Sequence, residues 1–372
     1  MKIAEFEVET WMTDHENNCQ YNLTETCVKP MSLNELQEFV EEDIVTSIMS
    51  MTMDYGPIVG SLALKKAILS LYETGNENNV TIAHGAINAN ELAMISLLEP
   101  GDHIISLFPT YQQMYDFPRS LGCEVSLIHL SEEKNWRPSI EDFKQCINSK
   151  TKMICLNSPN NPTGTTFPLS LIKEIIALAK AYDCYVLCDE IYRGVNTVTR
   201  KLCPSFSDYY DKAIVTQSLS KVFSFPGLRL GWIKGPKEVI HTIDLRRDYH
   251  IISSGPMDDY LATLILNHKE NILKRSLDIC RQNKKCLQEW LMQEPHVSCV
   301  IPEDGTVCFL KYDIDMPSQE LCEKLQKETG VFFVPGAAFG VENHLRYGFT
   351  HEVEYAKEGL TIFSKWLRQF DK

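Results

Sequence analysis

The 372-residue sequence lacks the features that mark membrane and secreted proteins. No apolar stretch approaches about 18 residues, the length that would suggest a membrane span. Residues 1–12 are acidic and contain neither the basic start nor the apolar core of a signal peptide. Low-complexity runs, internal repeats and Pro/Gly/Ser-rich linkers are also missing. These absences predict a globular, cytoplasmic protein with no membrane partner.

Positive charge is scarce too, because 36 Lys and Arg residues face 50 Asp and Glu residues and the formal net charge is −14. Nucleic-acid binding depends on clustered Lys and Arg, so this balance predicts small-molecule partners and no nucleic acid. The 13 cysteines are scattered, with no CxxC pair or nearby His pair, and neither disulfides nor a metal site are expected. Cys155, Cys184 and Cys188 lie in apolar runs and are expected to be reduced core residues.

The sequence does contain a regular alternation of strands and helices. Hydrophobic residues make up 44% of the chain and charged residues 23%, the balance of an ordinary globular protein, and the length fits two domains. From about residue 80 to residue 234, short β-rich runs alternate with helical patterns such as Leu169–Ala181, as βαβ units around a mainly parallel sheet require. The seven expected strands are Val80–Ala83, His103–Phe108, Glu124–Ile128, Met153–Asn157, Tyr185–Asp189, Ala213–Gln217 and Arg229–Ile233.

After about residue 255 the pattern changes to a long helical stretch followed by mixed strands and helices. Strand-like runs at 297–301 and 306–312, a helix near 318–328 and a final helix ending near 369 indicate a smaller α+β domain. The first 45 or so residues contain no βαβ unit and are expected to join this domain as an arm and a helix. We therefore predict an α/β protein with a large domain over 46–255 and a small domain formed by 1–45 and 256–372.

The strongest chemical signal is Ser218-Leu-Ser-Lys221, which follows a predicted strand and precedes Arg229 by a short loop. An amine at a strand end beside hydroxyls and a guanidinium can bond covalently to an aldehyde cofactor, while its neighbours hold a phosphate. Read alone, the segment has a lesser alternative, a structural turn that carries incidental charges.

Two further predicted strands end in polar residues. Asn157–Gly164 reads Asn-Ser-Pro-Asn-Asn-Pro-Thr-Gly, in which Pro and Gly also serve to turn the chain. Asp189 closes an apolar strand, and Tyr192 follows it. A buried carboxylate is costly unless it is paired, so Asp189 needs a cationic partner, or else it caps a following helix.

The turn at Gly85-Ala86-Ile87 opens a helix, whose unpaired N–H groups suit an anion. Tyr111 lies just beyond the next strand, where it can flank a ligand or be an ordinary core tyrosine. Arg346, near the C-terminus, has the planar guanidinium that grips a carboxylate at two points. The alternative for Arg346 is a surface ion pair with Glu342 or Glu352.

Taken together, these segments resemble the fold-type I, class I/II aminotransferases from about residue 22 to the end of the chain, in the order and spacing of that family. The resemblance implies a pyridoxal 5'-phosphate (PLP) enzyme in which Lys221 is the Schiff-base lysine. Asp189 is expected to pair with the pyridine nitrogen. Tyr192 and Asn161 are expected to contact the phenolic oxygen, and Tyr111 the ring. The resemblance assigns the phosphate to Gly85, Ala86, Ile87, Ser218, Ser220 and Arg229.

The resemblance also concerns the substrate and the assembly. Arg346, with Asn161 beside it, is expected to bind the α-carboxylate of the substrate. The segment Tyr55–Gly60 is similar to one whose tyrosine reaches the phosphate in the other subunit, which implies a homodimer with shared sites. Ile87 and the polar run Asn88–Glu91 depart from the common pattern and leave the substrate side chain undefined.

Aminotransfer from an α-amino acid to a 2-oxo acid is the activity that the resemblance favours. A PLP-dependent lyase or synthase of the same fold remains open, because one fold hosts several reactions. A non-catalytic PLP-binding regulator is disfavoured because Lys221 and Arg346 are both present and no DNA-binding extension is visible. A nicotinamide-dependent dehydrogenase is disfavoured because no G-x-G-x-x-G follows a predicted strand.

Overall fold

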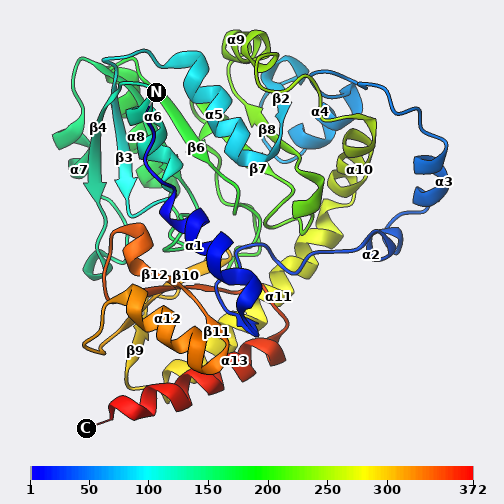
Figure 1. Ribbon diagram of the computed structural model, residues 1–372. Coiled ribbons are helices and arrows are strands. Elements are labelled where there is room, and N and C mark those ends of the chain that lie inside the picture. The colour runs from blue at the N-terminus through cyan, green and yellow to red at the C-terminus, as the bar shows by residue number, and fades with distance from the viewer. Residues whose placement is uncertain (1, 372) are drawn as a thin grey trace.

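The computed structural model describes residues 2–371 and contains a large and a small β-sheet, each with its own helices (Figure 1). The large sheet has seven strands in the order β2-β8-β7-β6-β5-β3-β4. Six of them run in one direction, and only β8 is antiparallel to its neighbours. The strands are β2 (Val80–Ala83), β3 (His103–Phe108), β4 (Glu124–His129), β5 (Thr151–Asn157), β6 (Tyr185–Asp189), β7 (Ala213–Ser218) and β8 (Gly231–Lys234).

The prediction of a mainly parallel seven-stranded sheet is confirmed, with one informative error at its last strand. The sequence predicts that this strand begins at Arg229, whereas β8 begins at Gly231. Arg229 instead has a left-handed backbone (φ 49°) that ends the short 3-10 helix Pro226–Leu228. Arg229 therefore lies in the loop before β8 rather than in the sheet.

Alternating side chains of the large sheet enter two separate hydrophobic layers. Along β5, Met153 and Cys155 pack into one cluster, whereas Ile154 and Leu156 pack into the other. This period of two is what a sheet covered on both faces requires. The first layer receives side chains from α5 (Gly85–Leu97), α6 (Gln113–Ser120) and α9 (Lys237–Arg247), and the second from α4 (Leu62–Leu69), α7 (Ile140–Cys146), α8 (Leu169–Ala181) and α10 (Pro256–Asn267).

The small sheet is antiparallel and has the order β12-β13-β10-β9. A separate parallel pair joins β1 to β11, so the N-terminal segment is attached to the C-terminal part of the chain. No helix within residues 2–371 is both long and apolar enough to cross a membrane. The remaining elements are α1 (Glu7–His15), β1 (Tyr21–Asn22), α2 (Leu33–Gln37), α3 (Ile44–Met49), α11 (Lys269–Leu291), β9 (Val297–Cys299), β10 (Val307–Tyr312), α12 (Ser318–Thr329), β11 (Val331–Phe332), β12 (Val334–Pro335), β13 (His344–Gly348) and α13 (Val353–Leu367).

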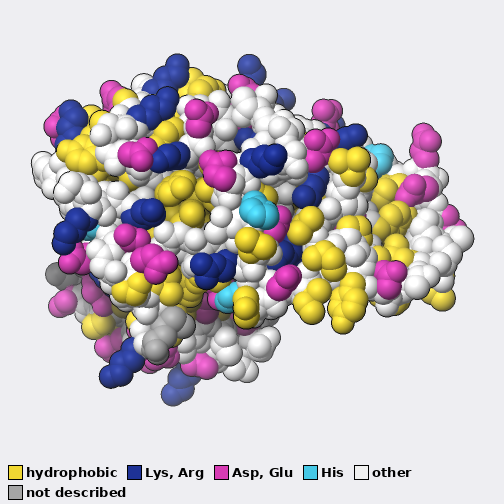
Figure 2. All heavy atoms as spheres, turned by 90° about the horizontal axis from the view of Figure 1, so that it is seen from above, with side chains coloured by type: hydrophobic (Ala, Val, Ile, Leu, Met, Phe, Trp, Pro, Cys, Tyr) yellow, Lys and Arg dark blue, Asp and Glu magenta, His cyan; other side chains and the backbone are white. Residues whose placement is uncertain are grey.

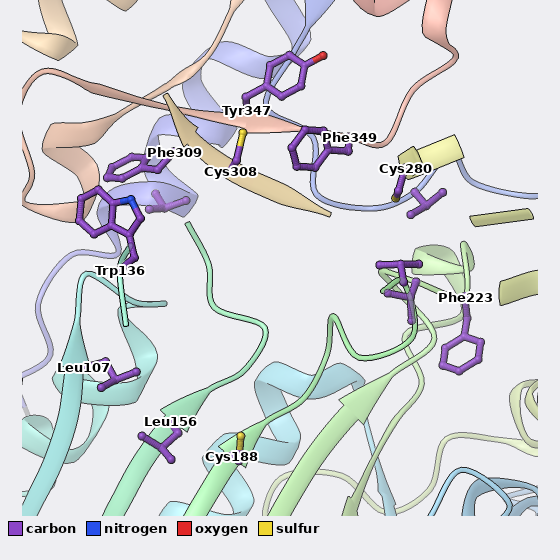
Figure 3. Close-up of a cluster of buried hydrophobic side chains, with 14 of the residues drawn as sticks. Leu107, Trp136, Leu156, Cys188, Phe223, Cys280, Cys308, Phe309, Tyr347 and Phe349 are labelled. Carbon is purple, nitrogen blue, oxygen red and sulfur yellow. The ribbon is translucent and has the colours of Figure 1, made fainter. Parts of the chain in front are cut away.

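One hydrophobic cluster continues from the large sheet into the small one (Figure 3). Leu156 belongs to the large sheet and Phe309 to the small one, and both are members of this cluster. Trp136 bridges the two regions, because its indole ring lies 5.7 Å from the Phe309 ring, centroid to centroid. This shared cluster therefore fixes the position of one sheet relative to the other. The domain limits at 45/46 and 255/256 stay a prediction.

Candidate active site

The residues expected to carry chemistry meet at the carboxyl edge of the large sheet. Asn157, Asp189 and Ser218 are the last residues of three parallel strands, and parallel strands bring their carboxyl ends to the same edge. A cavity of about 400 Å³ opens there. The sequence-predicted residues that line it are Ala86, Ile87, Tyr111, Asn161, Asp189, Tyr192, Ser220, Lys221, Arg229 and Arg346.

Lys221 lies three residues after β7, and its amine points into the cavity. Its Nζ donates to Thr26 Oγ1 at 2.6 Å and lies 3.3 Å from Cys27 Sγ. Burial disfavours the ammonium, but the Cys27, Tyr192, Glu25 and Glu9 groups outweigh burial and raise the pKa of Lys221 above its usual value. These groups therefore favour the protonated form of the free amine.

Asp189 is only 3% exposed, and its carboxylate forms no ion pair with a Lys, Arg or His among residues 2–371. Its Oδ2 accepts from the Asn90 amide at 2.8 Å, and its Oδ1 accepts from the Ile191 N–H at 3.0 Å. Burial raises the pKa of Asp189 to about 6, although both donors and Lys221 act in the opposite direction. No helix begins after β6 at this point, so the helix-capping alternative is not realised.

Asn90 holds Asp189 in place and was not identified from the sequence. Its Oδ1 accepts from Thr216 Oγ1 at 2.5 Å, which leaves the amide nitrogen to face Asp189. The signal was present, since Asn90 belongs to the polar run in which the sequence departs from the pattern of the family that it resembles. Asn90 therefore acts as a positioning residue that fixes the carboxylate toward the cavity.

A cup for an anion forms where α5 begins. Gly85 has φ 72°, and a Cβ there would lie 2.9 Å from Arg229 Nη2, so the guanidinium passes directly over the start of the helix. Arg229 Nη1 donates to Ser220 Oγ at 3.3 Å. A Cβ at Gly231 would lie 2.5 Å from the carbonyl carbon of Gly85, so only glycine allows this approach of β8 to α5.

Ser218 is placed differently from its predicted role. It does not line the cavity, and its buried Oγ accepts the N–H of Ser220 at 3.2 Å. The hydroxyl thus shapes the turn that presents Ser220 and Lys221. Direct contact between Ser218 and a phosphate stays a prediction.

The polar side chains above the sheet edge are fixed by neighbours. The Asn161 N–H donates to Asn157 Oδ1 at 2.7 Å, and Tyr111 donates its hydroxyl to Glu9 Oε1 at 2.8 Å. Tyr192 is buried, and burial raises its pKa, so it is a neutral phenol at physiological pH. Asn161, Tyr111 and Tyr192 therefore all line the cavity, with the Tyr111 hydroxyl held by Glu9.

Arg346 lies on β13 and reaches the cavity from the small sheet with only 3% of its surface exposed. Its Nε donates to Thr24 Oγ1 at 3.0 Å, and its Nη1 lies 3.5 Å from Asn161 Oδ1. Its Nη2 faces only Met12 Sδ, at 3.7 Å. None of these partners is a carboxylate.

The surface ion pairs considered for Arg346 do not form. Glu342 accepts from the Ser318 N–H, and Glu352 pairs with Lys29. The guanidinium is therefore buried, and its forked end lacks a matching anion among residues 2–371.

Tyr55 lies outside this cavity and is 67% exposed at the molecular surface. Sequence reasoning also missed the wall formed by the N-terminal segment. This wall consists of Val8, Glu9, Met12, Thr13, Glu16, Glu25, Thr26 and Cys27. No local motif marks these residues, because only the folded chain brings them to the sheet edge.

The fold and this edge site define a PLP-dependent enzyme, and comparison with known proteins gives the family. Residues 19–363 match the family described as aminotransferase class I and II, and the chain belongs to it. A PLP-dependent aminotransferase from Streptococcus suis has a similar structure, with a TM-score of 0.96, 39% identity and full coverage of both chains.

Two curated relatives differ in their named activities. A capreomycidine synthase from Streptomyces vinaceus is 24% identical over 97% of this chain and 93% of its own length. An aspartate aminotransferase from Pyrococcus horikoshii is 27% identical over 84% of this chain and 83% of its own length. The family and its cofactor are therefore established, whereas the relatives differ in the reaction that they catalyse.

The residues of the cavity fit PLP. The buried Asp189 carboxylate has only neutral donors as partners, which suits a protonated pyridine nitrogen. The start of α5, with Ser220 and Arg229, suits the phosphate, and Lys221 lines the same cavity as Asp189 and Ser220. The cavity thus offers a partner to the ring nitrogen, to the phosphate and to the aldehyde of PLP.

Proposed function

We propose that this enzyme transfers the amino group of an α-amino acid to a 2-oxo acid. The observation that carries the proposal is the buried Arg346 fork, which enters the same cavity as Lys221 without a carboxylate partner. An α-carboxylate bound to Arg346 by two parallel hydrogen bonds has a fixed orientation. The amino acid is then held with its Cα–H bond within reach of the Lys221 amine.

When bound, PLP supplies an aldehyde that bonds to amino groups and a ring that accepts electrons from Cα. Asp189 keeps the ring nitrogen protonated, and Asn90 keeps Asp189 aimed at it. Tyr192 and Asn161 would hold the ring oxygen. Lys221, as a free neutral amine, would act as the base that takes the proton from Cα. The predicted roles of these residues are consistent with their positions in the cavity.

A lyase or synthase reaction is the second candidate, and the match to capreomycidine synthase over nearly the whole chain favours it. Both candidates begin with loss of the Cα proton to Lys221. They differ in what leaves the site, since aminotransfer yields a 2-oxo acid and a lyase releases ammonia or a side-chain fragment. A non-catalytic regulator would need neither the base nor the Arg346 clamp.

The reaction in heavy water tests the proposal. We expect a true substrate to exchange its α-hydrogen with solvent and to yield its 2-oxo acid, with little carbon dioxide, because the Arg346 guanidinium would hold the α-carboxylate at two points. Nuclear magnetic resonance follows the α-position, and trapping assays follow the products. Exchange that leads to ammonia and pyruvate indicates a lyase. Carbon dioxide release without exchange contradicts the clamp.

Arg346→Lys is expected to weaken substrate binding about tenfold or more, because a single ammonium cannot reproduce the two parallel bonds. Steady-state kinetics should show the loss mainly in KM. Arg119→Lys is the matched control, because Arg119 forms an ion pair with Asp116 at the surface, outside the cavity. Equal behaviour of the two variants would remove Arg346 from the binding site.

We also propose a homodimer in which Tyr55 of each subunit completes the site of the other. Tyr55 lies in a stretch whose large apolar side chains are unusually exposed, namely Val45, Met49, Met53, Ile58 and Leu62. Figure 2 shows hydrophobic side chains gathered on the side where Figure 1 places α3 and α10. Burying such side chains against a second copy of the chain removes apolar surface from water.

Mixed dimers test this arrangement. A dimer with Lys221→Ala in one subunit and Tyr55→Phe in the other has one site with both defects and one intact site. After random mixing, about half of the dimers are of this kind, so about a quarter of all sites are intact. We expect activity above the average of the two parent variants. Activity at that average, or a fully active monomer in sedimentation, contradicts shared sites.

A further inference from the structure

The N-terminal helix α1 forms one wall of the active-site cavity. Glu9, Met12, Thr13 and Glu16 all line the cavity, and their spacing of three, four and seven residues places them on one face of the helix and its continuation. Figure 1 shows α1 between the large sheet and the small one. The chemistry of this face therefore contributes to which substrate the cavity accepts.

The position of α1 is fixed from both sides. The Trp11 indole N–H donates to the Phe333 carbonyl at 3.0 Å, and the His15 ring contacts Gln326 Oε1 at 3.0 Å, which ties the helix to the small domain. On the other side, the Gln112 amide donates to the Glu5 carbonyl at 2.7 Å. The glutamates of α1 are therefore held at the cavity by a helix that is anchored to both parts of the protein.

Three carboxylates of the N-terminal segment, Glu9, Glu16 and Glu25, line the cavity. Glu9 accepts from Tyr111, and Glu25 accepts the N–H groups of Thr26 and Cys27, each at 2.7 Å. The Glu16 carboxylate has no hydrogen-bond or ion-pair partner among residues 2–371. Burial raises the pKa of Glu16, and the charges of Glu25 and Glu9 add to this effect, so the three groups share one electrostatic environment.

Arg346 independently shows where a ligand lies against this wall. The side chain is almost fully buried, and its Nη2 points at Met12, which lies between Glu9 and Glu16 on the same face of α1. A substrate carboxylate that binds this fork brings Cα close to α1. The substrate side chain then extends along a surface that carries Glu9, Glu16 and Glu25.

We infer that the substrate is an α-amino acid whose side chain ends in a guanidinium or an ammonium group, which pairs with Glu9 and Glu16. This inference rests on the proposed amino-acid reaction and deepens it. A carboxylate side chain, as in aspartate, would meet like charges at this wall. A neutral side chain would leave the Glu16 carboxylate without an ion-pair partner among residues 2–371, whereas a planar guanidinium can bind carboxylates at two points.

The test compares arginine with citrulline, its neutral isostere, on the PLP-loaded enzyme. We expect kcat/KM for arginine to exceed that for citrulline and for aspartate about tenfold or more. Glu16→Gln and Glu9→Gln should each lower the arginine-to-citrulline ratio about tenfold. Activity on citrulline itself should change little in Glu16→Gln, whereas Glu9→Gln also alters the contact with Tyr111. Ornithine and lysine tell whether the ammonium is accepted as well as the guanidinium, and preference for either cation supports the inference.

Asp14→Asn is the matched control, because Asp14 lies on α1 but does not line the cavity, and the ratio should not change. A preference for aspartate or for neutral amino acids, or a ratio unaffected in both glutamine variants, overturns the cationic substrate while aminotransfer stands. Failure of every amino acid in the panel to exchange its α-hydrogen overturns the proposed function itself. Retained PLP absorbance verifies that each variant is folded.

Discussion

Lys221→Ala is expected to lower turnover about a thousandfold or more while much of the PLP stays bound. The structure separates the two tasks of this region. The start of α5, Ser220 and Arg229 form the anion cup, whereas the Lys221 amine points into the cavity beside Thr26. Removing the amine therefore takes away the base and leaves the phosphate contacts. Equilibrium dialysis measures retained PLP, and single-turnover kinetics measure the loss of proton transfer.

A small soluble amine added to this variant should restore part of the rate, because it can enter the space that the missing side chain leaves. Lys284→Ala serves as the control. Lys284 is also a buried lysine, but it donates to the carbonyls of Glu303 and Asp304, away from the cavity. This control should lose stability and keep its chemical step. Near-normal turnover of Lys221→Ala would remove Lys221 from the mechanism.

Asp189→Ala is expected to lower kcat about a hundredfold or more with a smaller change in KM. The side chain is buried with only neutral donors around it, so its charge is available to the ring nitrogen of the cofactor. Without this carboxylate the ring nitrogen loses its proton and accepts electrons from Cα less readily. Pre-steady-state kinetics with a substrate deuterated at Cα measure the proton-transfer step directly.

Asp304→Ala provides the comparison for this variant. Asp304 is another buried carboxylate, but it accepts from Asn196 and Thr166 outside the cavity. Its loss should affect the free energy of unfolding and leave proton transfer unchanged. If Asp189→Ala changed only affinity for the substrate, Asp189 would be a structural residue rather than a partner of the ring.

Sequence patterns predict the strands well, because apolar runs bounded by turns leave few alternatives for a buried parallel sheet. The bounds of β2, β3 and β6 agree with the prediction to the residue. The same patterns place Asn157 and Asp189 at strand ends, and the parallel arrangement then brings them together. The positions of Asn157 and Asp189 in the site therefore follow from the local sequence pattern.

The α1 wall could not be predicted in this way. Glu9 and Glu16 reach the cavity only because Trp11 and His15 attach the helix to the small domain, more than 300 residues away in sequence. Thr26 likewise meets Lys221 across 195 residues. Contacts of this separation depend on packing of the whole chain, and a single sequence carries no periodic signal for them.

The reversed direction of β8 has a consequence for how the cofactor anchor assembles. Because β8 starts at the edge where the other strands end, the chain between Ser218 and Gly231 stays at that edge and brings Arg229 back beside Ser220. The hydrogen bond between Arg229 and Ser220 spans only nine positions of sequence, and closing a loop of that length costs little conformational entropy. Lys221 and Arg229 therefore lie in one segment of low contact order, whose ends are positioned as soon as β7 pairs with β8.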